Sequence, residues 1–208
     1  MFIFNRSTTL NRHRMLEATM ASIEVAALVT KITGVDINVF ATRYGEPGNT
    51  MAWTCRVDSQ AELDALTTKL MANEDYLAWI GSKSEMFETA TVDRLSSIIS
   101  STLTPEVKKY YTVLTAQAAS GQMGAAIDFG VRAQQLVAEK TGLATAFMTG
   151  VYGPFGTVGW ITGGATMADI DKLWALQMGD ADYHALVAEA GPLFIETSGQ
   201  TMLIEKLN

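Results

Sequence analysis

The chain has few of the residues that metal and disulfide chemistry needs. Among its 208 residues there is one cysteine, Cys55, so no disulfide can form within the chain. There are only two histidines, His13 and His184, and they lie far apart in the sequence. An ordinary structural zinc site takes four Cys or His ligands, so no metal site is predicted.

Positive charge and long apolar runs are also scarce. Lys and Arg total 15 against 22 Asp and Glu, and the net charge of −7 would repel a phosphate backbone, so no nucleic-acid partner is expected. No apolar run reaches the roughly 18 residues that a membrane-spanning helix needs. The opening "MFIF" is shorter than the core of an export signal. We therefore expect no membrane association and a cytoplasmic location, which the lone cysteine also favours.

What the chain does contain is a repeat of itself. The stretch "NEDYLAWIGSKSEMFET", residues 73–89, returns as "GDADYHALVAEAGPLFIET", residues 179–197. Tyr76 is matched by Tyr183 at an offset of 107 positions, and the match extends along nearly the whole chain with the offset moving only between 107 and 108. A repeat of this length indicates a duplicated structural unit.

Each copy shows the same order of expected elements. Alternating and β-rich runs predict strands, helical periodicity predicts helices, and Gly34 and Gly142 are placed to end the first helix of each copy. Ser59 is the expected N-cap of a helix, with Glu62 as its capping-box partner. The expected order is strand 1–7, helix from about 12, hairpin 35–44 with 50–58, helix 60–71, short helix near 75–81 and strand 93–100; then strand 109–117, helix 124–140, hairpin 143–152 with 157–164, helices 167–178 and 182–190, and strand 199–207.

The order β-α-β-β-α-β is the ferredoxin-like motif, an antiparallel sheet with both helices on one side. The strands carry apolar residues on both faces, as Val39 and Phe40 illustrate, so the helix-free face must also be buried. We therefore predict an α+β protein: two tandem ferredoxin-like β-α-β-β-α-β repeats, 1–100 and 101–208, packed sheet to sheet.

The duplicated halves and the phrase "DADYHALVAEAGPLF" resemble the dimeric α+β barrel superfamily, particularly its NIPSNAP-like branch. In that superfamily two ferredoxin-like units usually form the barrel as a homodimer. The resemblance implies that this tandem chain makes an intramolecular dimeric α+β barrel. Pairing of two whole chains into a homodimer stays open.

The superfamily includes haem-degrading enzymes, which use an Asn on the first strand, a Trp on a later helix and a His about ten residues beyond it. Asn5 and Trp79 match by position, but the tenth residue after Trp79 is Thr89, and Leu186 replaces the Trp in the second half. Imidazole is the usual haem-iron ligand. Haem is therefore not expected, and no other cofactor is predicted.

Polar and aromatic side chains gather on the two predicted hairpins and suggest a ligand pocket, because pockets combine apolar walls with a few polar groups. The alternative is that the tryptophans simply fill the core. His184 could be a ligand or a base, but Leu77 at its counterpart position favours packing or solvent contact, and Cys55 is expected to be an inert buried thiol. The candidate ligand-binding residues are Arg43, Tyr44, Trp53, Arg56, Tyr152, Trp160 and His184.

Three functions stay open. The leading hypothesis is a protein that binds or processes a small hydrophobic, oxygenated metabolite, of the cofactor-independent monooxygenase or isomerase type. The second is a non-enzymatic structural or assembly protein, and the third is a haem-binding or haem-degrading protein. The sequence names neither the substrate nor the oligomeric state.

Overall fold

The computed structural model of the protein describes residues 1–208. Contacts divide the chain into two compact units, Met1–Leu95 with Lys206–Asn208 and Ser96–Glu205. The strands are β1 Phe2–Thr9, β2 Asn38–Tyr44, β3 Thr50–Val57, β4 Val92–Ser101, β5 Tyr110–Gln117, β6 Ala144–Tyr152, β7 Thr157–Gly164 and β8 Gln200–Lys206. The α-helices are α1 Met15–Thr33, α2 Gln60–Met71, α3 Glu74–Lys83, α4 Met123–Thr141, α5 Met167–Gly179 and α6 Ala181–Val187, and the 3-10 turns are η1 Arg12–Arg14, η2 Ser84–Met86 and η3 Gly191–Leu193.

The eight strands form a closed antiparallel barrel in the order β1-β3-β2-β8-β5-β7-β6-β4. The predicted fold class, tandem ferredoxin-like repeats making an α+β barrel within one chain, is confirmed. The repeat boundaries 1–100 and 101–208 stay a prediction. No helix of the protein is both long and apolar enough to cross a membrane.

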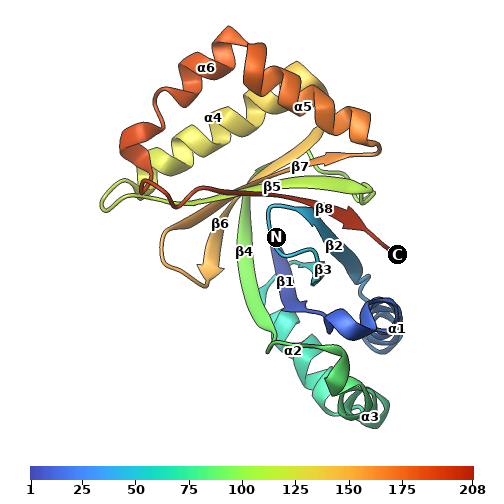
Figure 1. Ribbon diagram of the computed structural model, residues 1–208. Coiled ribbons are helices and arrows are strands. Elements are labelled where there is room, and N and C mark those ends of the chain that lie inside the picture. The colour runs from blue at the N-terminus through green and yellow to red at the C-terminus, as the bar shows by residue number, and fades with distance from the viewer. The chain divides into compact units, whose positions relative to one another are not determined.

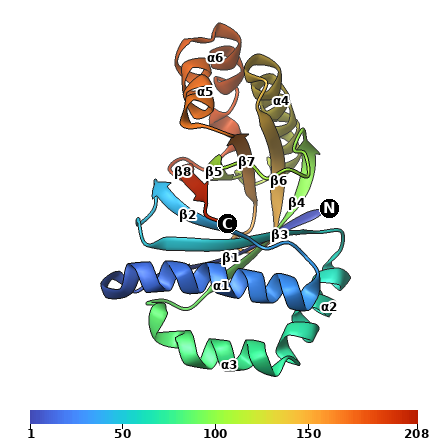
Figure 2. The ribbon, with the colours of Figure 1, turned by 90° about the vertical axis from the view of Figure 1, so that its right-hand side faces the viewer.

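In the first unit, alternation along the strands decides which side chains meet the helices. Trp53 of β3 pairs in register with Arg6 of β1 and Val39 of β2, and residues directly opposite in an antiparallel pair share a face. Trp53 and Val39 belong to the core that α1 covers, and Figure 2 shows α1 and α3 on one side of β1 and β3. Asn5 and Thr54, one position along, therefore lie on the opposite face.

The second unit repeats this arrangement. Figure 1 shows α4, α5 and α6 on one side of β5 and β7. Trp160 of β7 pairs with Leu114 of β5 and Phe147 of β6, as Trp53 pairs with its neighbours in the first unit. The core combines Phe147 and Val158 with Trp160 and its ring neighbours.

A shared hydrogen bond fixes the long helix to the sheet in each unit. The indole Nε1 of Trp53 donates to the backbone oxygen of Ser22 at 2.9 Å, and that of Trp160 donates to the backbone oxygen of Gly130 at 3.0 Å. A buried indole N–H needs an acceptor, and each finds it on the helix that it packs against. The tryptophans thus make equivalent packing contacts in the two units.

The contact beneath each long helix is filled differently. In the second unit a Cβ added at Gly130 would overlap the ring of Phe147, which is completely buried. In the first unit the equivalent positions hold Ser22 and Val39, at the offset of 108 that relates 22 to 130 and 39 to 147. The first unit thus has the larger of the two helix residues, Ser22, and the smaller strand residue, Val39. The second unit has the smaller helix residue and the larger strand residue.

The helix ends agree closely with the sequence. Gly34 and Gly142 adopt left-handed conformations with φ of 82° and 69°, and their N–H groups donate to Thr30 and Ala138 backbone oxygens. Ser59 accepts from the Glu62 N–H, as predicted. The Glu62 carboxylate, however, accepts from the N–H of Asp58 at 2.7 Å rather than from Ser59, so the expected capping box is shifted by one residue.

Candidate functional site

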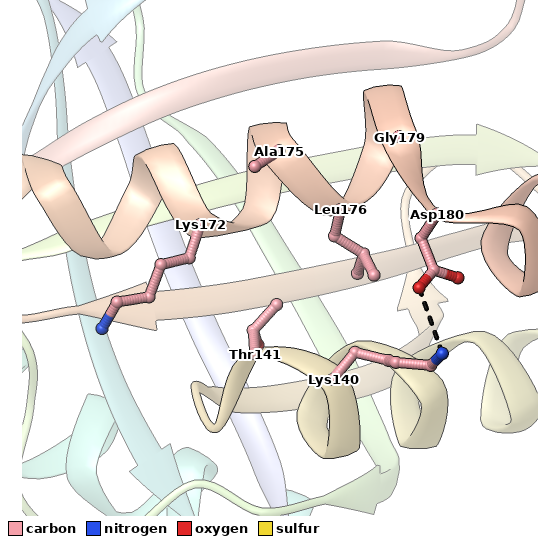
Figure 3. A pocket seen from close by; sticks show the side chains of 7 residues that line it. All are labelled: Lys140, Thr141, Lys172, Ala175, Leu176, Gly179 and Asp180. Atoms are coloured by element: carbon pink, nitrogen blue, oxygen red, sulfur yellow. Dashed lines mark ion pairs between the residues drawn. The ribbon is translucent and has the colours of Figure 1, made fainter.

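An open hollow in the second unit lies where the ends of α4 and α5 meet Asp180 (Figure 3). Its volume is about 390 Å³, and Leu176 is its one buried apolar side chain. The ammonium of Lys140 is 3.1 Å from Asp180 and 2.6 Å from Asp182, so its charge is already matched. The lining residues are Lys140, Thr141, Lys172, Ala175, Leu176, Gly179 and Asp180.

The ionisable groups of this hollow hold each other in their charged forms. The pKa of Lys140 is raised, first by its hydrogen bond to Asp182 and then by that to Asp180. The pKa of Asp180 is lowered, first by the backbone N–H of Tyr183 and then by Lys140. A group poised for proton transfer at neutral pH needs the opposite kind of shift. The hollow is a surface ion-pair region, and none of the candidate residues from the sequence lines it.

The candidate residues of the first unit do not converge. Tyr44, at the end of β2, is 71% exposed. By strand alternation, Arg43 follows Val39 onto the helix-covered face, whereas Arg56 pairs with Ile3 on the other face. Trp53 is buried in the core with its N–H in use.

The candidate residues of the second unit are also dispersed. Tyr152, at the end of β6, is 61% exposed, and Trp160 packs under α4. His184 lies on the exposed surface of α6, where its Nε2 is 2.8 Å from the backbone oxygen of Gln177. The assignment of these residues to a ligand site stays a prediction.

Cys55 lies in the helix-covered layer of the first unit and is 5% exposed. Burial raises the pKa of its thiol from the ordinary 9.0 to about 11, with a smaller contribution from Glu62. The thiolate, which is the nucleophilic form, is therefore suppressed at neutral pH. An inert buried thiol was expected here.

This position predicts the labelling behaviour of Cys55. Iodoacetamide at pH 8 should alkylate the native protein at least tenfold more slowly than the urea-unfolded chain, as followed by mass spectrometry. Because the folded-state pKa lies above the unfolded one, the protonated thiol is favoured by folding, and this contribution is lost as the pH rises from about 9 through 11. Equal labelling of both states would contradict the buried position.

The two residues that match the haem-degrading pattern, Asn5 and Trp79, lie on opposite sides of the sheet. Asn5 faces away from the helices, whereas Trp79 sits on α3 within the helix-covered layer. Thr89 stands at the place of the missing histidine and binds the end of β1. Its backbone oxygen accepts from the hydroxyl of Thr8 at 2.8 Å, and its own hydroxyl accepts from that of Thr9 at 3.0 Å. The structure contains no group of three or more side chains placed to hold a metal ion.

Trp79 has an unusual environment. Its ring packs against Phe87, which in turn contacts Trp53, with ring centroids 6.4 Å and 5.9 Å apart. Its indole Nε1 is buried and has no hydrogen-bond partner. A buried donor without an acceptor costs about 1–3 kcal/mol, and such groups are uncommon in folded proteins. Trp79 therefore presents an unused donor within an aromatic layer.

An ion pair lies on the same face of the sheet. Arg6 of β1 donates from Nε and Nη2 to the two carboxylate oxygens of Asp93, both at 2.7 Å. The guanidinium carbon lies 5.9 Å from the ring centre of Phe4. The pKa of Arg6 is raised, first by the hydrogen bond to Asp93 and to a smaller extent by the nearby hydroxyl of Tyr76. Tyr76 and Trp79 are both on α3, one turn apart.

The second unit shows that the fold does not need Arg6, Asp93 or Trp79. At the equivalent positions it has Leu114 for Arg6 and Thr201 for Asp93, and these two residues pair in register between β5 and β8. Leu186 stands where the first unit has Trp79. One unit thus keeps apolar or neutral residues where the other has an ion pair and an unused donor. We take Arg6, Tyr76, Trp79 and Asp93 as the candidate site.

Sequence reasoning missed three of these four residues. Arg6 and Asp93 are 87 positions apart, and no motif joins them. For Arg6 and Asp93 the available signal was the internal repeat, because positions that change from an apolar or neutral residue to a charged one between the copies mark a difference that the fold does not require. Tyr76 is matched by Tyr183 and carries no such signal.

Comparison with known proteins identifies structures of the same architecture. A candidate monooxygenase from Fusobacterium nucleatum subsp. nucleatum has a TM-score of 0.71 at 8% identity, covering 100% of this chain and 92% of that chain. An anthrone oxidase-like protein has a TM-score of 0.69 at 13% identity, covering 100% and 91%. A candidate monooxygenase from Lactobacillus acidophilus NCFM has a TM-score of 0.67 at 9% identity, covering 99% and 93%.

No protein-family model matches the chain, and no curated protein matches it in sequence. At such low identities the structural likeness concerns the fold alone. It agrees with the predicted dimeric α+β barrel over essentially the full length of the chain.

Proposed function

We propose that this protein binds a small, flat, apolar molecule with a carbonyl or phenolic oxygen on the helix-covered face of the first unit, and that the bound molecule is oxidised directly by O2. The observation that carries the proposal is the buried indole N–H of Trp79, which lacks an acceptor. The surrounding rings of Phe87 and Trp53 offer the apolar contact that a flat molecule needs.

An unused N–H in an apolar layer suits a substrate oxygen that gains negative charge during reaction. An anthrone is one such molecule, since loss of a proton from its CH2 group delocalises charge onto the carbonyl oxygen. A fixed donor aimed at that oxygen stabilises the charge more strongly than water does. Trp79 would supply this donor.

The overall reaction closes without a cofactor. Anthrone and one O2 give anthraquinone and one water: the CH2 carbon is oxidised, one oxygen atom forms the new carbonyl, and the other leaves as water with the two hydrogens of that carbon. Support for oxygen chemistry comes from the shared architecture with proteins described as candidate monooxygenases and as anthrone oxidase-like. The substrate itself is the reductant and O2 is the oxidant.

The test compares Trp79→Phe with the wild type, using anthrone as the probe. The rate of anthraquinone formation, followed by absorbance together with O2 uptake, should fall by about 100-fold or more, because loss of one donor to a developing oxyanion has effects of that order. Trp174→Phe is the matched control, because Trp174 is 63% exposed on α5 and lies outside the site.

Binding provides a second readout. The indole N–H signal of Trp79 in 1H–15N spectra, assigned by its loss in Trp79→Phe, should shift when anthraquinone is added, whereas the signal of Trp174 should not. A protein that neither accelerates anthrone oxidation nor shows this shift does not have the proposed function.

A further inference from the structure

The guanidinium of Arg6 retains hydrogen-bonding capacity after it has bound Asp93. An arginine has five N–H donors, and Asp93 takes one from Nε and one from Nη2. The hydroxyl of Tyr76 also interacts with this guanidinium, so two of the five N–H donors remain when Asp93 and Tyr76 have each been counted. Arg6 can therefore hold Asp93 and Tyr76 and still donate to a further acceptor.

The ion pair does not have a purely structural explanation. A partly exposed pair of this kind contributes on the order of 0–1 kcal/mol to stability. The second unit builds the same pair of strands with Leu114 and Thr201 at these positions. Asp93 instead fixes the orientation of Arg6, because two parallel hydrogen bonds define the plane of the guanidinium.

Arg6 and Trp79 differ in their access to solvent. The side chain of Arg6 is 37% exposed, and that of Asp93 is 45% exposed. The Nε1 of Trp79 is fully buried. A molecule held by both would have its apolar ring and one oxygen inside the helix-covered layer and a second oxygen at the solvent-facing margin. Such a margin is where an ionised oxygen loses the least hydration.

We infer that the ligand of this protein is a flat ketone or quinone that carries a second, ionised oxygen, bound by the remaining N–H donors of Arg6. This inference rests on the proposed function, since it names the ligand class of the same site. Arg6 is the residue that selects for the anionic group, and Asp93 is a positioning residue that acts through Arg6. Charged acceptors are the ones that a guanidinium holds most strongly.

Two commercial naphthoquinones separate the ring from the charge. In 2-hydroxy-1,4-naphthoquinone the ring carries an oxygen that is ionised at neutral pH, and in 2-methyl-1,4-naphthoquinone a methyl group occupies the same position. The wild type, measured by calorimetric titration, should bind the hydroxy compound about 10- to 100-fold more tightly than the methyl compound, as expected for a hydrogen bond to a charged group.

The decisive variant is the double substitution Arg6→Leu with Asp93→Thr, which installs the residues of the second unit and leaves no carboxylate unpaired. The ratio of the two dissociation constants should fall to within about threefold of one. Arg132→Leu is the matched control, because Arg132 makes a similar bidentate ion pair with Glu189 on the surface of the other unit. It should retain the wild-type ratio.

The outcomes distinguish the two proposals. A ratio that is large in the wild type and survives in the double variant overturns the role of Arg6, and so does a ratio near one in the wild type. Failure of both naphthoquinones to bind the wild type overturns this inference, and the anthrone oxidation assay then decides separately whether the proposed function fails as well. Asp93→Asn tests the positioning role of Asp93 while Arg6 stays in place. It should lower the ratio of the two dissociation constants, because Arg6 is then held less firmly, and far-UV circular dichroism checks that the variant folds.

Discussion

Replacing Trp53 with alanine is expected to lower the free energy of unfolding by about 3–5 kcal/mol, the range for truncation of a large buried aromatic side chain. Trp53 is 9% exposed and contacts Phe87 edge to face. Its N–H also binds the oxygen of Ser22 in the middle of α1. The substitution removes the packing and the bond that fixes helix to sheet.

Urea unfolding followed by far-UV circular dichroism measures this loss, since fluorescence would change with the removal of a tryptophan. Trp174→Ala is the control: the same chemical change at a residue that is 63% exposed should cost less than about 1 kcal/mol. Comparable losses for the two variants would mean that Trp53 does not hold α1 to the sheet. Trp53→Phe serves as the milder variant, because a loss of about 3–5 kcal/mol is a large part of the stability of an ordinary domain.

Gly130→Ala is expected to destabilise the protein by about 1–3 kcal/mol, although glycine to alanine inside a helix ordinarily stabilises by about 0.5–1 kcal/mol. The reason is the ring of Phe147, which occupies the space that the new methyl group would need. Gly124→Ala in the same helix is the control, because a Cβ there would meet nothing within 4 Å. We expect that substitution to be neutral or stabilising.

The first unit suggests a second substitution that should compensate for a side chain at position 130. Gly130→Ser alone should destabilise, and Gly130→Ser with Phe147→Val, which reproduces the Ser22 and Val39 pair, should recover part of the loss. A double-mutant cycle measures the coupling directly. Additive effects of the two substitutions would show that the residues do not compete for the same space.

The architecture could be predicted from sequence because the signals for it are local and occur twice. Gly34 and Gly142 each end a helix in the predicted place, and Ser59 caps α2 as expected. Whether a residue faces the helices could be predicted only in part, since it depends on register. Arg43 and Arg56 were both candidates for one ligand pocket, but strand alternation in the register of β2 with β3 places them on opposite faces.

The candidate site could not be found by spacing. Asp93 reaches Arg6 through the pairing of distant strands, and neither residue stands in a recognisable motif. Trp79 was noticed through its resemblance to a haem-degrading pattern, yet its lack of an acceptor is a property of packing that no sequence pattern records. The unequal residues of the two copies give the more useful guide, because each copy serves as a reference for the other.

The reversed sizes beneath α1 and α4 also bear on how the two halves of the gene can evolve. Gene conversion copies one repeated stretch of DNA onto another. A copied tract that ended between the helix and the strand would combine the serine of one unit with the phenylalanine of the other, or the glycine with the valine. Such hybrids would carry either a clash or a void. Selection against them would keep the halves diverging, and so preserve Arg6, Trp79 and Asp93 in one half only.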